Sequence, residues 1–206
     1  MNRRDLLKQI ALLTGGAVIG GELFLTGCKT GAKMDAGFTP VTIAMLDEVG
    51  ETIIPATSTP GAKAAQIGEF MKTMVTDCYT AAEQTAFTEG IVKLNDACKK
   101  MHGKDFVECT PQQRKELLVS LEKEAKNFND KVNKENEAAS KQDPNNPNLV
   151  RKPIHYYTMM KQLTLFGFFT SKTGMTETLR YIPVPGKYDG AFPYKKGDKA
   201  WAESGC

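Results

Sequence analysis

The chain has 206 residues, and its 27 Lys and Arg residues against 24 Asp and Glu residues give a net charge of only +3 at pH 7. A charge this close to neutral argues against nucleic acid as a partner, because nucleic-acid binding needs a clustered basic surface. With 41% hydrophobic residues, the sequence is long and apolar enough to form one domain with its own core.

The N-terminal segment carries two export signals in the expected order. Arg3 and Arg4 precede an apolar stretch over residues 10–25, which is the arrangement of a twin-arginine signal peptide. This stretch ends in Leu25-Thr-Gly-Cys28, the small-residue pattern of a lipoprotein cleavage site. We therefore expect residues 1–27 to be a cleaved signal peptide and Cys28 to become the lipid-bearing first residue. The alternative is an uncleaved membrane anchor, which needs about 20 mainly apolar residues, whereas glycines interrupt this run.

These signals predict a location on the periplasmic side of a bacterial cell envelope. The twin-arginine route moves proteins that are already folded, so it favours a protein that gains a cofactor or partner before export. Lipid on Cys28 would hold the protein to the inner or the outer membrane, and the sequence leaves both open. Residues 28–38 are then a tether, and residues 39–206 are expected to form a single helical domain.

Apolar residues at helical spacing predict the first helices of this domain. Thr39-Pro40 opens a helix that Pro55 ends, and a turn-rich loop follows over residues 55–61. A second helix is expected over residues 62–79. The acidic residues of the first helix are expected to lie on a solvated face; they are Asp47, Glu48 and Glu51.

Two further helices begin at sequences typical of capping boxes. Thr80 with Glu83 starts the third helix, and Thr110 with Gln113 starts the fourth.

A fifth helix is expected from Pro153 to Phe168, with Gly167 allowing a close helix contact, and a short helix follows over residues 175–179. Because alternating apolar runs are rare, the fold class is predicted to be all-α, a compact domain of about five helices.

Two segments lack a helical apolar pattern. Residues 129–152 are polar and end in Asp-Pro-Asn-Asn-Pro, which predicts a solvated helix end running into a surface loop, with a domain boundary as the alternative. Residues 180–206 form an irregular tail rich in proline, glycine and aromatic residues. Because disordered segments are poor in aromatic residues, this tail should pack either on the chain's own helices or in a groove of a partner. The candidate partner contacts are Tyr181, Tyr188, Phe192, Tyr194 and Trp201.

Besides the lipid-bearing Cys28, the mature chain has four cysteines, and an oxidising compartment would allow them to pair. Cys78 with Cys98 would tie two helices, Cys98 with Cys109 would close a short loop, and Cys206 could bridge to a partner. These alternatives stay open. The sequence has no CxxC or Cys/His cluster, so we expect no haem, iron–sulfur cluster or metal site on this chain.

The two histidines are weak candidates for chemistry. His155 lies beside Tyr156 and Tyr157 and could move a proton, but no cysteine or carboxylate pair accompanies it in the sequence. His102 is expected to lie at a helix C-terminus, where its charge would favour the helix dipole. No glycine-rich dinucleotide fingerprint is present. The sequence therefore assigns no catalytic residue.

Several runs resemble the gluconate 2-dehydrogenase subunit 3 family. They are Leu46-Asp-Glu-Val-Gly-Glu-Thr-Ile-Ile-Pro55, Thr59-Pro-Gly-Ala62, Leu163-Thr-Leu-Phe-Gly-Phe-Phe-Thr-Ser171 and Tyr181-Ile-Pro-Val-Pro-Gly-Lys-Tyr-Asp-Gly190. The twin-arginine signal also fits that family, whereas the lipoprotein pattern at Cys28 departs from its simplest form.

The resemblance implies an accessory role in a membrane-bound sugar or sugar-acid dehydrogenase. It implies a large flavoprotein subunit of the glucose–methanol–choline (GMC) type that carries FAD, and a cytochrome c subunit that takes the electrons. The small subunit would supply the export signal that the large subunit lacks. A stand-alone envelope lipoprotein acting as a binding or scaffold module is the alternative, and an enzyme using His155 is a second one.

Overall fold

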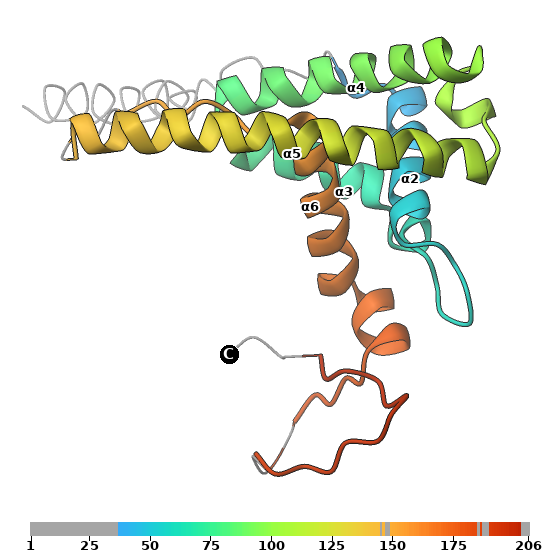
Figure 1. Ribbon diagram of the computed structural model, residues 1–206. Helices are drawn as coiled ribbons and strands as arrows, with labels where there is room; N and C mark the ends of the chain where they lie inside the picture. The colour runs from blue at the N-terminus through green and yellow to red at the C-terminus, as the bar shows by residue number, and fades with distance from the viewer. Residues whose placement is uncertain (1–36, 145, 147–148, 185, 187–189, 203–206) are drawn as a thin grey trace, which may run out of the picture. The chain divides into compact units, whose positions relative to one another are not determined.

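The computed structural model describes residues 37–144, 146, 149–184, 186 and 190–202. The expected signal peptide, Arg3, Arg4, Cys28, Tyr188 and Cys206 lie outside these residues. Within them the chain is all-α, as predicted (Figure 1). The helices are α2 (Pro40–Ile53), α3 (Ile67–Cys78), α4 (Ala81–His102), α5 (Pro111–Gln142) and α6 (Tyr156–Thr170), with the short turns η2 (Ala62–Ala65), η3 (Phe106–Glu108) and η4 (Gly174–Thr178).

The three predicted threonine caps are confirmed. Thr39 Oγ1 accepts a hydrogen bond from the Thr42 amide at 3.2 Å. Thr80 and Thr110 each form a full capping box, in which the side chain three residues later accepts from the threonine amide at 2.9 Å and 3.0 Å respectively. Each such cap stabilises its helix by about 1 kcal/mol. Short-range side-chain chemistry therefore sets where these helices begin.

Two expected elements differ in the structure. The helix predicted over residues 62–79 is divided into η2 and α3, because Gln66 takes a left-handed conformation with φ of 53°. The surface loop expected within residues 129–152 begins only after Gln142, since the solvated end of α5 continues through residues 129–142. That stretch contains no glycine or proline and is rich in Lys, Glu and Ala, so helix propensity sustains it without an apolar stripe.

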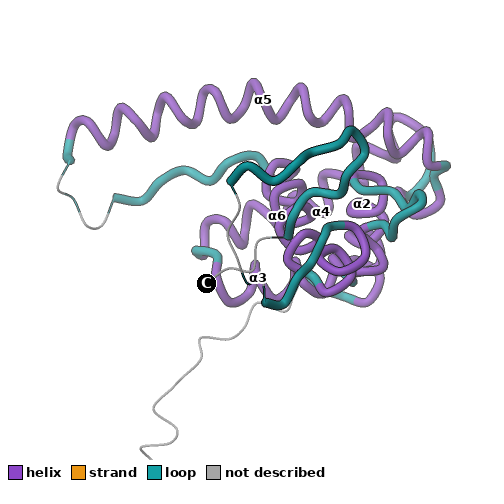
Figure 2. Tube along the Cα trace, turned by 90° about the horizontal axis from the view of Figure 1, so that it is seen from below, coloured by secondary structure: helices purple, strands orange, loops and turns teal. Residues whose placement is uncertain are grey.

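Helix α6 lies at the centre of the described domain and contacts α2, α3, α4 and α5. Its buried residues join a core that includes Leu46, Phe87 and Leu121 from the surrounding helices. The segment leading into α6 runs back along α5 (Figure 2), where the Asn136 side chain both donates to and accepts from the backbone of Lys152. This pairing, together with the buried Val132, anchors the largely solvated second half of α5.

Two glycines let neighbouring elements approach α6 closely. A Cβ atom on Gly90 of α4 would lie 2.3 Å from the Cβ of Tyr156, and one on Gly167 would lie 2.5 Å from the Phe70 ring. The close helix contact expected at Gly167 is thus confirmed, and Gly90 provides a second one that the sequence analysis missed.

Gly90→Ala should lower the free energy of unfolding by about 1–3 kcal/mol, because the new methyl group overlaps a part of Tyr156 that cannot rotate away. The matched control is Gly50→Ala in α2, where the added Cβ would meet Ala62 and Ile67 at 3.4 Å. Its stability should be unchanged or rise by up to about 1 kcal/mol, since alanine favours a helix interior. Chemical denaturation of both variants measures this, and equal stability of Gly90→Ala and the unchanged protein would contradict the packing described here.

Candidate subunit interface

The acidic residues of α2 hold neighbouring segments of the chain in place. The expectation that they lie on a solvated face without a structural role is therefore wrong. The Glu51 carboxylate accepts hydrogen bonds from the amides of Ala56 at 2.8 Å and Lys63 at 3.0 Å. A Cβ atom on Gly61 would lie 2.4 Å from the same carboxylate and 2.6 Å from the backbone nitrogen of Ala56, so the loop has room only for glycine there. The Glu51 carboxylate therefore holds the two ends of the loop between α2 and η2 together.

Its neighbours on α2 hold other elements in the same way. Asp47 accepts from the amide of Gly68 at 2.8 Å, at the N-terminus of α3. Glu48 pairs with Lys63 and with Arg114 of α5. Although partial burial raises the pKa of Glu48, the hydrogen bonds from Lys63 and Arg114 outweigh it and hold the pKa below its ordinary value. A carboxylate that stays ionised and paired in this way positions helices and is not available as a general acid.

His155 is the N-cap of α6 and is buried. Its Nδ1 accepts a hydrogen bond from the Tyr157 amide at 3.3 Å, and its own amide donates to Asn129 at 2.8 Å. Its ring packs against Phe128 and Tyr156, at 5.4 Å and 4.3 Å between ring centroids. These contacts assign His155 a structural role in starting α6. His102, the last residue of α4, lies at 3.1 Å from the Gln113 carbonyl oxygen and so joins α4 to α5.

A groove of about 390 Å³ runs between α5 and α6. Its polar lining groups are largely paired with each other: Lys161 binds both carboxylate oxygens of Glu122, at 2.7 Å and 2.8 Å, and Asn129 donates to Thr158 at 2.8 Å. Tyr157 in its wall has a raised pKa, because it is largely buried. These two contacts tie α5 to α6 along the wall of the groove.

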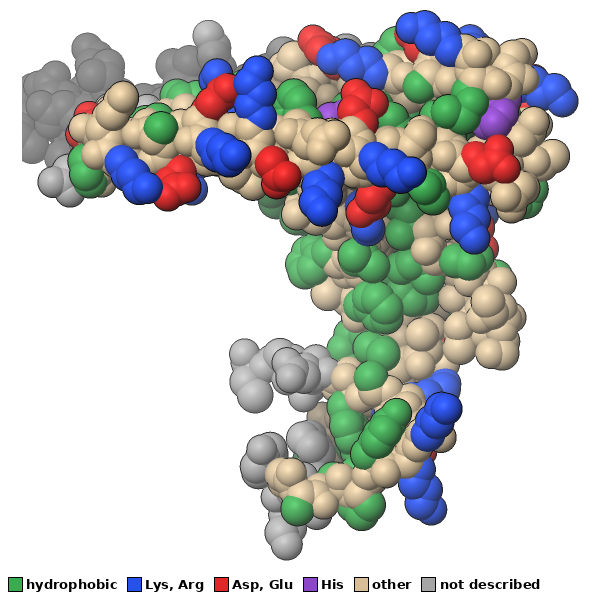
Figure 3. Space-filling view, viewed as in Figure 1, with side chains coloured by type: hydrophobic (Ala, Val, Ile, Leu, Met, Phe, Trp, Pro, Cys, Tyr) green, Lys and Arg blue, Asp and Glu red, His purple; other side chains and the backbone are tan. Residues whose placement is uncertain are grey.

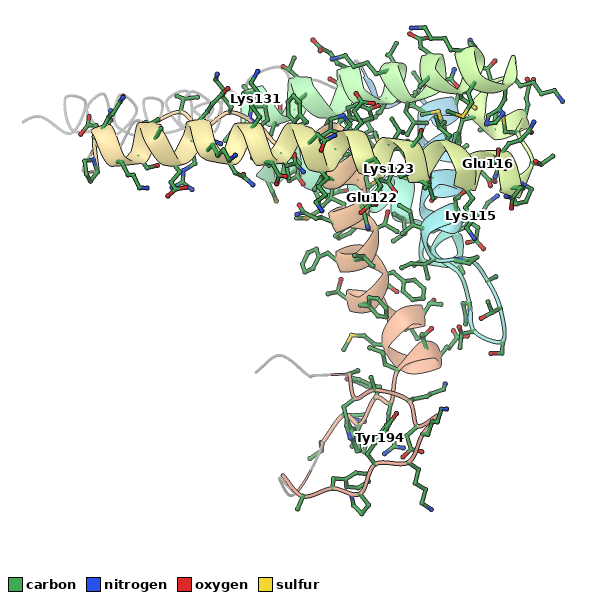
Figure 4. The ribbon with its side chains drawn as sticks, in the orientation of Figure 1. Lys115, Glu116, Glu122, Lys123, Lys131 and Tyr194 are labelled. Atoms are coloured by element: carbon green, nitrogen blue, oxygen red, sulfur yellow. The ribbon has the colours of Figure 1, made fainter. Side chains whose placement is uncertain are left out.

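The outward faces of α5 and α6 differ sharply in character. Charged side chains follow one another along α5, as the labelled Lys115, Glu116, Glu122, Lys123 and Lys131 show in Figure 4. Apolar side chains gather instead over α6 in Figure 3. Such a change of surface chemistry between adjacent helices is expected where one of them meets a partner.

The apolar surface comes from the second half of α6. Leu165, Phe166 and Phe169 are 40%, 54% and 40% exposed, while Leu163 and Phe168 on the opposite side are buried in the core. We call the three exposed residues the α6 face. The sequence analysis missed this face, although a signal for it exists: a helix that is apolar around its whole circumference must be covered on all sides.

The tail after η4 closes on itself through Arg180. The backbone of Arg180 exchanges hydrogen bonds with Ala200 at 2.8 Å and Ala202 at 3.0 Å. Its guanidinium lies 4.7 Å from the Trp201 ring centroid and 5.6 Å from that of Phe192. Phe192 and Trp201 meet edge to face at 5.5 Å. This stacking gives the tail a defined aromatic cluster.

The described tail residues from 181 to 201 are all exposed, so they are not buried against the chain's own helices. Tyr194, labelled in Figure 4, is 77% exposed, and Tyr181 is 40% exposed. Of the two expectations for the tail, packing on the chain's own helices is therefore wrong for these residues.

The three described cysteines occupy different environments. Cys78 is exposed at the end of α3, whereas Cys98 and Cys109 are buried with their sulfur atoms 3.2 Å apart.

Among the described residues, no three His, Cys, Asp or Glu side chains lie together in a way that could hold a metal ion. None of the helices in the described ranges is long and apolar enough to cross a bilayer.

The free energy of unfolding should fall as the pH drops below about 6.5, because burial lowers the pKa of His155 beneath that ordinary value. Below pH 6.5 the unfolded chain binds a proton at His155 that the folded chain does not bind. One such group lowers the free energy of unfolding by up to about 1.4 kcal/mol for each pH unit. His155→Asn keeps an N-cap acceptor and should flatten the slope between about pH 7 and pH 5. His102→Gln is the matched control and should keep it. A slope unchanged in His155→Asn would refute this assignment.

Comparison with known proteins identifies the family to which this arrangement belongs. Residues 40–186, well over half of the chain, match the family described as gluconate 2-dehydrogenase subunit 3. Comparisons with curated proteins and with solved structures gave no significant match. The matched range covers α2 to α6 and the first part of the tail, including both the α2 carboxylates and the α6 face. The chain therefore belongs to the gluconate 2-dehydrogenase subunit 3 family.

Proposed function

We propose that this protein is the non-catalytic small subunit of an FAD-dependent sugar or sugar-acid dehydrogenase complex. The observation that carries the proposal is the α6 face, three large apolar side chains left exposed on the central helix of a domain whose family is named for a dehydrogenase subunit. Exposed aromatic side chains that lie together in this way are typical of protein–protein contact surfaces.

The partner is a large flavoprotein subunit of the GMC type. In this arrangement FAD belongs to the large subunit, and a cytochrome c subunit takes the electrons from it. The assignment of FAD to the partner rests on the family resemblance. The described residues of this chain support a binding role, since the partly buried carboxylates of α2 and the buried His155 already have structural partners.

The α6 face is suited to hold such a partner. Aromatic residues dominate the energy of protein interfaces, and fully burying a Phe or Leu side chain contributes about 1.5–3 kcal/mol. Phe166 is already oriented by its ring contact with Phe70, at 5.8 Å between centroids. The tail cluster offers a second anchor, because Arg180 holds Phe192 and Trp201 before binding and so reduces the entropy lost in the complex.

The N-terminal signals give the subunit its second task. A flavoprotein without a signal of its own folds around FAD in the cytoplasm, binds this chain, and crosses the membrane with it through the route addressed by Arg3 and Arg4. Lipid on Cys28 then keeps the complex at the inner or outer membrane, on the periplasmic side.

The alternative is a stand-alone envelope lipoprotein that serves as a binding or scaffold module. It would share the same signals but predicts a stable monomer without a large exposed apolar patch. The exposed α6 face favours the subunit over this alternative.

The double variant Phe166→Gln/Phe169→Gln should lose most of the flavoprotein that co-precipitates with tagged protein from detergent-solubilised membranes. Both side chains are half exposed, so the fold should remain, as circular dichroism can verify. The matched control is Val92→Gln/Val119→Gln, which replaces apolar residues of 60% and 49% exposure on α4 and α5. This control should retain the partner. Equal retention by both double variants would place the interface elsewhere.

The double variant Arg3→Lys/Arg4→Lys should leave both this chain and the flavoprotein in the cytoplasm. The dehydrogenase activity would then be found in the cytoplasmic fraction. Cell fractionation followed by detection of both subunits measures this. Cys28→Ala is the matched control, since it removes the lipid site and leaves the arginine pair intact. If the flavoprotein still reached the envelope in the arginine variant, the escort role would be wrong.

A further inference from the structure

Two buried thiols meet where α4 passes into α5. Cys98 lies near the end of α4, and Cys109 follows η3, directly before the Thr110 cap of α5. Their sulfur atoms are 3.2 Å apart, and the two residues are 0% and 4% exposed. Of the pairings that the sequence left open, this one brings its two sulfur atoms into contact.

The contact is imposed by groups other than the cysteines. Asn95 of α4 accepts a hydrogen bond from the Phe106 amide at 2.9 Å, and Lys99 pairs with Asp105 at 3.0 Å. Arg114 of α5 donates to the carbonyl oxygens of Phe106 at 3.0 Å and Val107 at 2.7 Å. The turn is thus held against both helices while the thiols are still reduced, so the two sulfur atoms are positioned in advance.

We infer that Cys98 and Cys109 form an intramolecular disulfide once the protein is exposed to an oxidising compartment. A disulfide needs a sulfur–sulfur distance of about 2.05 Å, so the two atoms have to approach by only about 1 Å from 3.2 Å. The compartment rests on the export step of the proposed function, whereas the pairing itself rests on the geometry of this turn.

The reaction is a thiol–disulfide exchange with an external disulfide, such as oxidised glutathione or the disulfide of a thiol oxidase. One cysteine, as thiolate, attacks the external disulfide and releases one thiol, leaving a mixed disulfide on the protein. The second cysteine then attacks the protein sulfur of that mixed disulfide and releases the other thiol. Overall, two protein thiols are oxidised and one external disulfide is reduced to two thiols.

The burial of the two thiols limits when this exchange can take place. Burial, followed by the hydrogen bond with Cys109, raises the pKa of the Cys98 thiol to about 12, so the folded protein contains little of the reactive thiolate. Exchange therefore proceeds through local opening of the turn, or during folding. A protein folded in the reducing cytoplasm keeps the pair as thiols and closes the bond after export.

The test uses the full chain in detergent, unfolded and then refolded either in a buffer of reduced and oxidised glutathione or in dithiothreitol. After free thiols are alkylated, trypsin cuts between the two cysteines at Lys99, Lys100 and Lys104. Mass spectrometry should find peptides 94–99 and 105–114 joined in the glutathione sample and separate after reduction. The melting temperature should be roughly 6–12 °C higher in glutathione, since the bond closes a short loop of the unfolded chain.

Cys78→Ala is the matched control and should keep both the joined peptides and the shift in melting temperature. Cys98→Ala and Cys109→Ala should each lose them, with equal melting temperatures in the two buffers. Alkylation of both cysteines in the glutathione sample, or a link from Cys98 to Cys78 or Cys206, would overturn the inference. If the bond forms on refolding but the pair is reduced in protein taken from cells, the pairing stands and the export step of the proposed function fails.

Discussion

The second half of α6, from Leu163 to Phe169, is apolar around most of its circumference, and the rest of the domain packs around this helix. Four helices contact it, and the close approaches at Gly90 and Gly167 bring α4 and α3 nearer than side chains on those residues would allow. Because the cover is incomplete over the second half of α6, Leu165, Phe166 and Phe169 remain in water. The same packing that builds the core therefore also leaves the surface to which we assign partner binding.

The polar groups of the domain serve this packing. Asp47, Glu48 and Glu51 each tie α2 to a neighbouring turn or helix, and His155 starts α6 from within the core. Buried polar groups need such partners, because each unpaired one costs about 1–3 kcal/mol. A domain whose ionisable groups are engaged in this way is a rigid support, which suits a subunit that presents a surface to a larger protein.

The sequence predicted the elements that local chemistry determines. The threonine caps at Thr39, Thr80 and Thr110 appear as expected, because a cap is a contact between residues three positions apart. The break at Gln66 was missed, because a glutamine gives no local sign of a left-handed conformation. The roles of the α2 carboxylates and the exposure of Phe166 depend on contacts with residues distant in sequence. The spacing of apolar residues along a helix does not predict such contacts. For the candidate site, the aromatic tail was predicted, while the α6 face required the structure.

The most direct test of this account is the flavin content of the complex purified through a tag on this chain from detergent-solubilised native membranes. We predict a stable complex with a single large subunit, whose absorbance spectrum shows one flavin for each copy of the small subunit and is bleached by a sugar or sugar-acid substrate. A colourless preparation that contains only this chain would contradict the subunit assignment and favour a stand-alone lipoprotein.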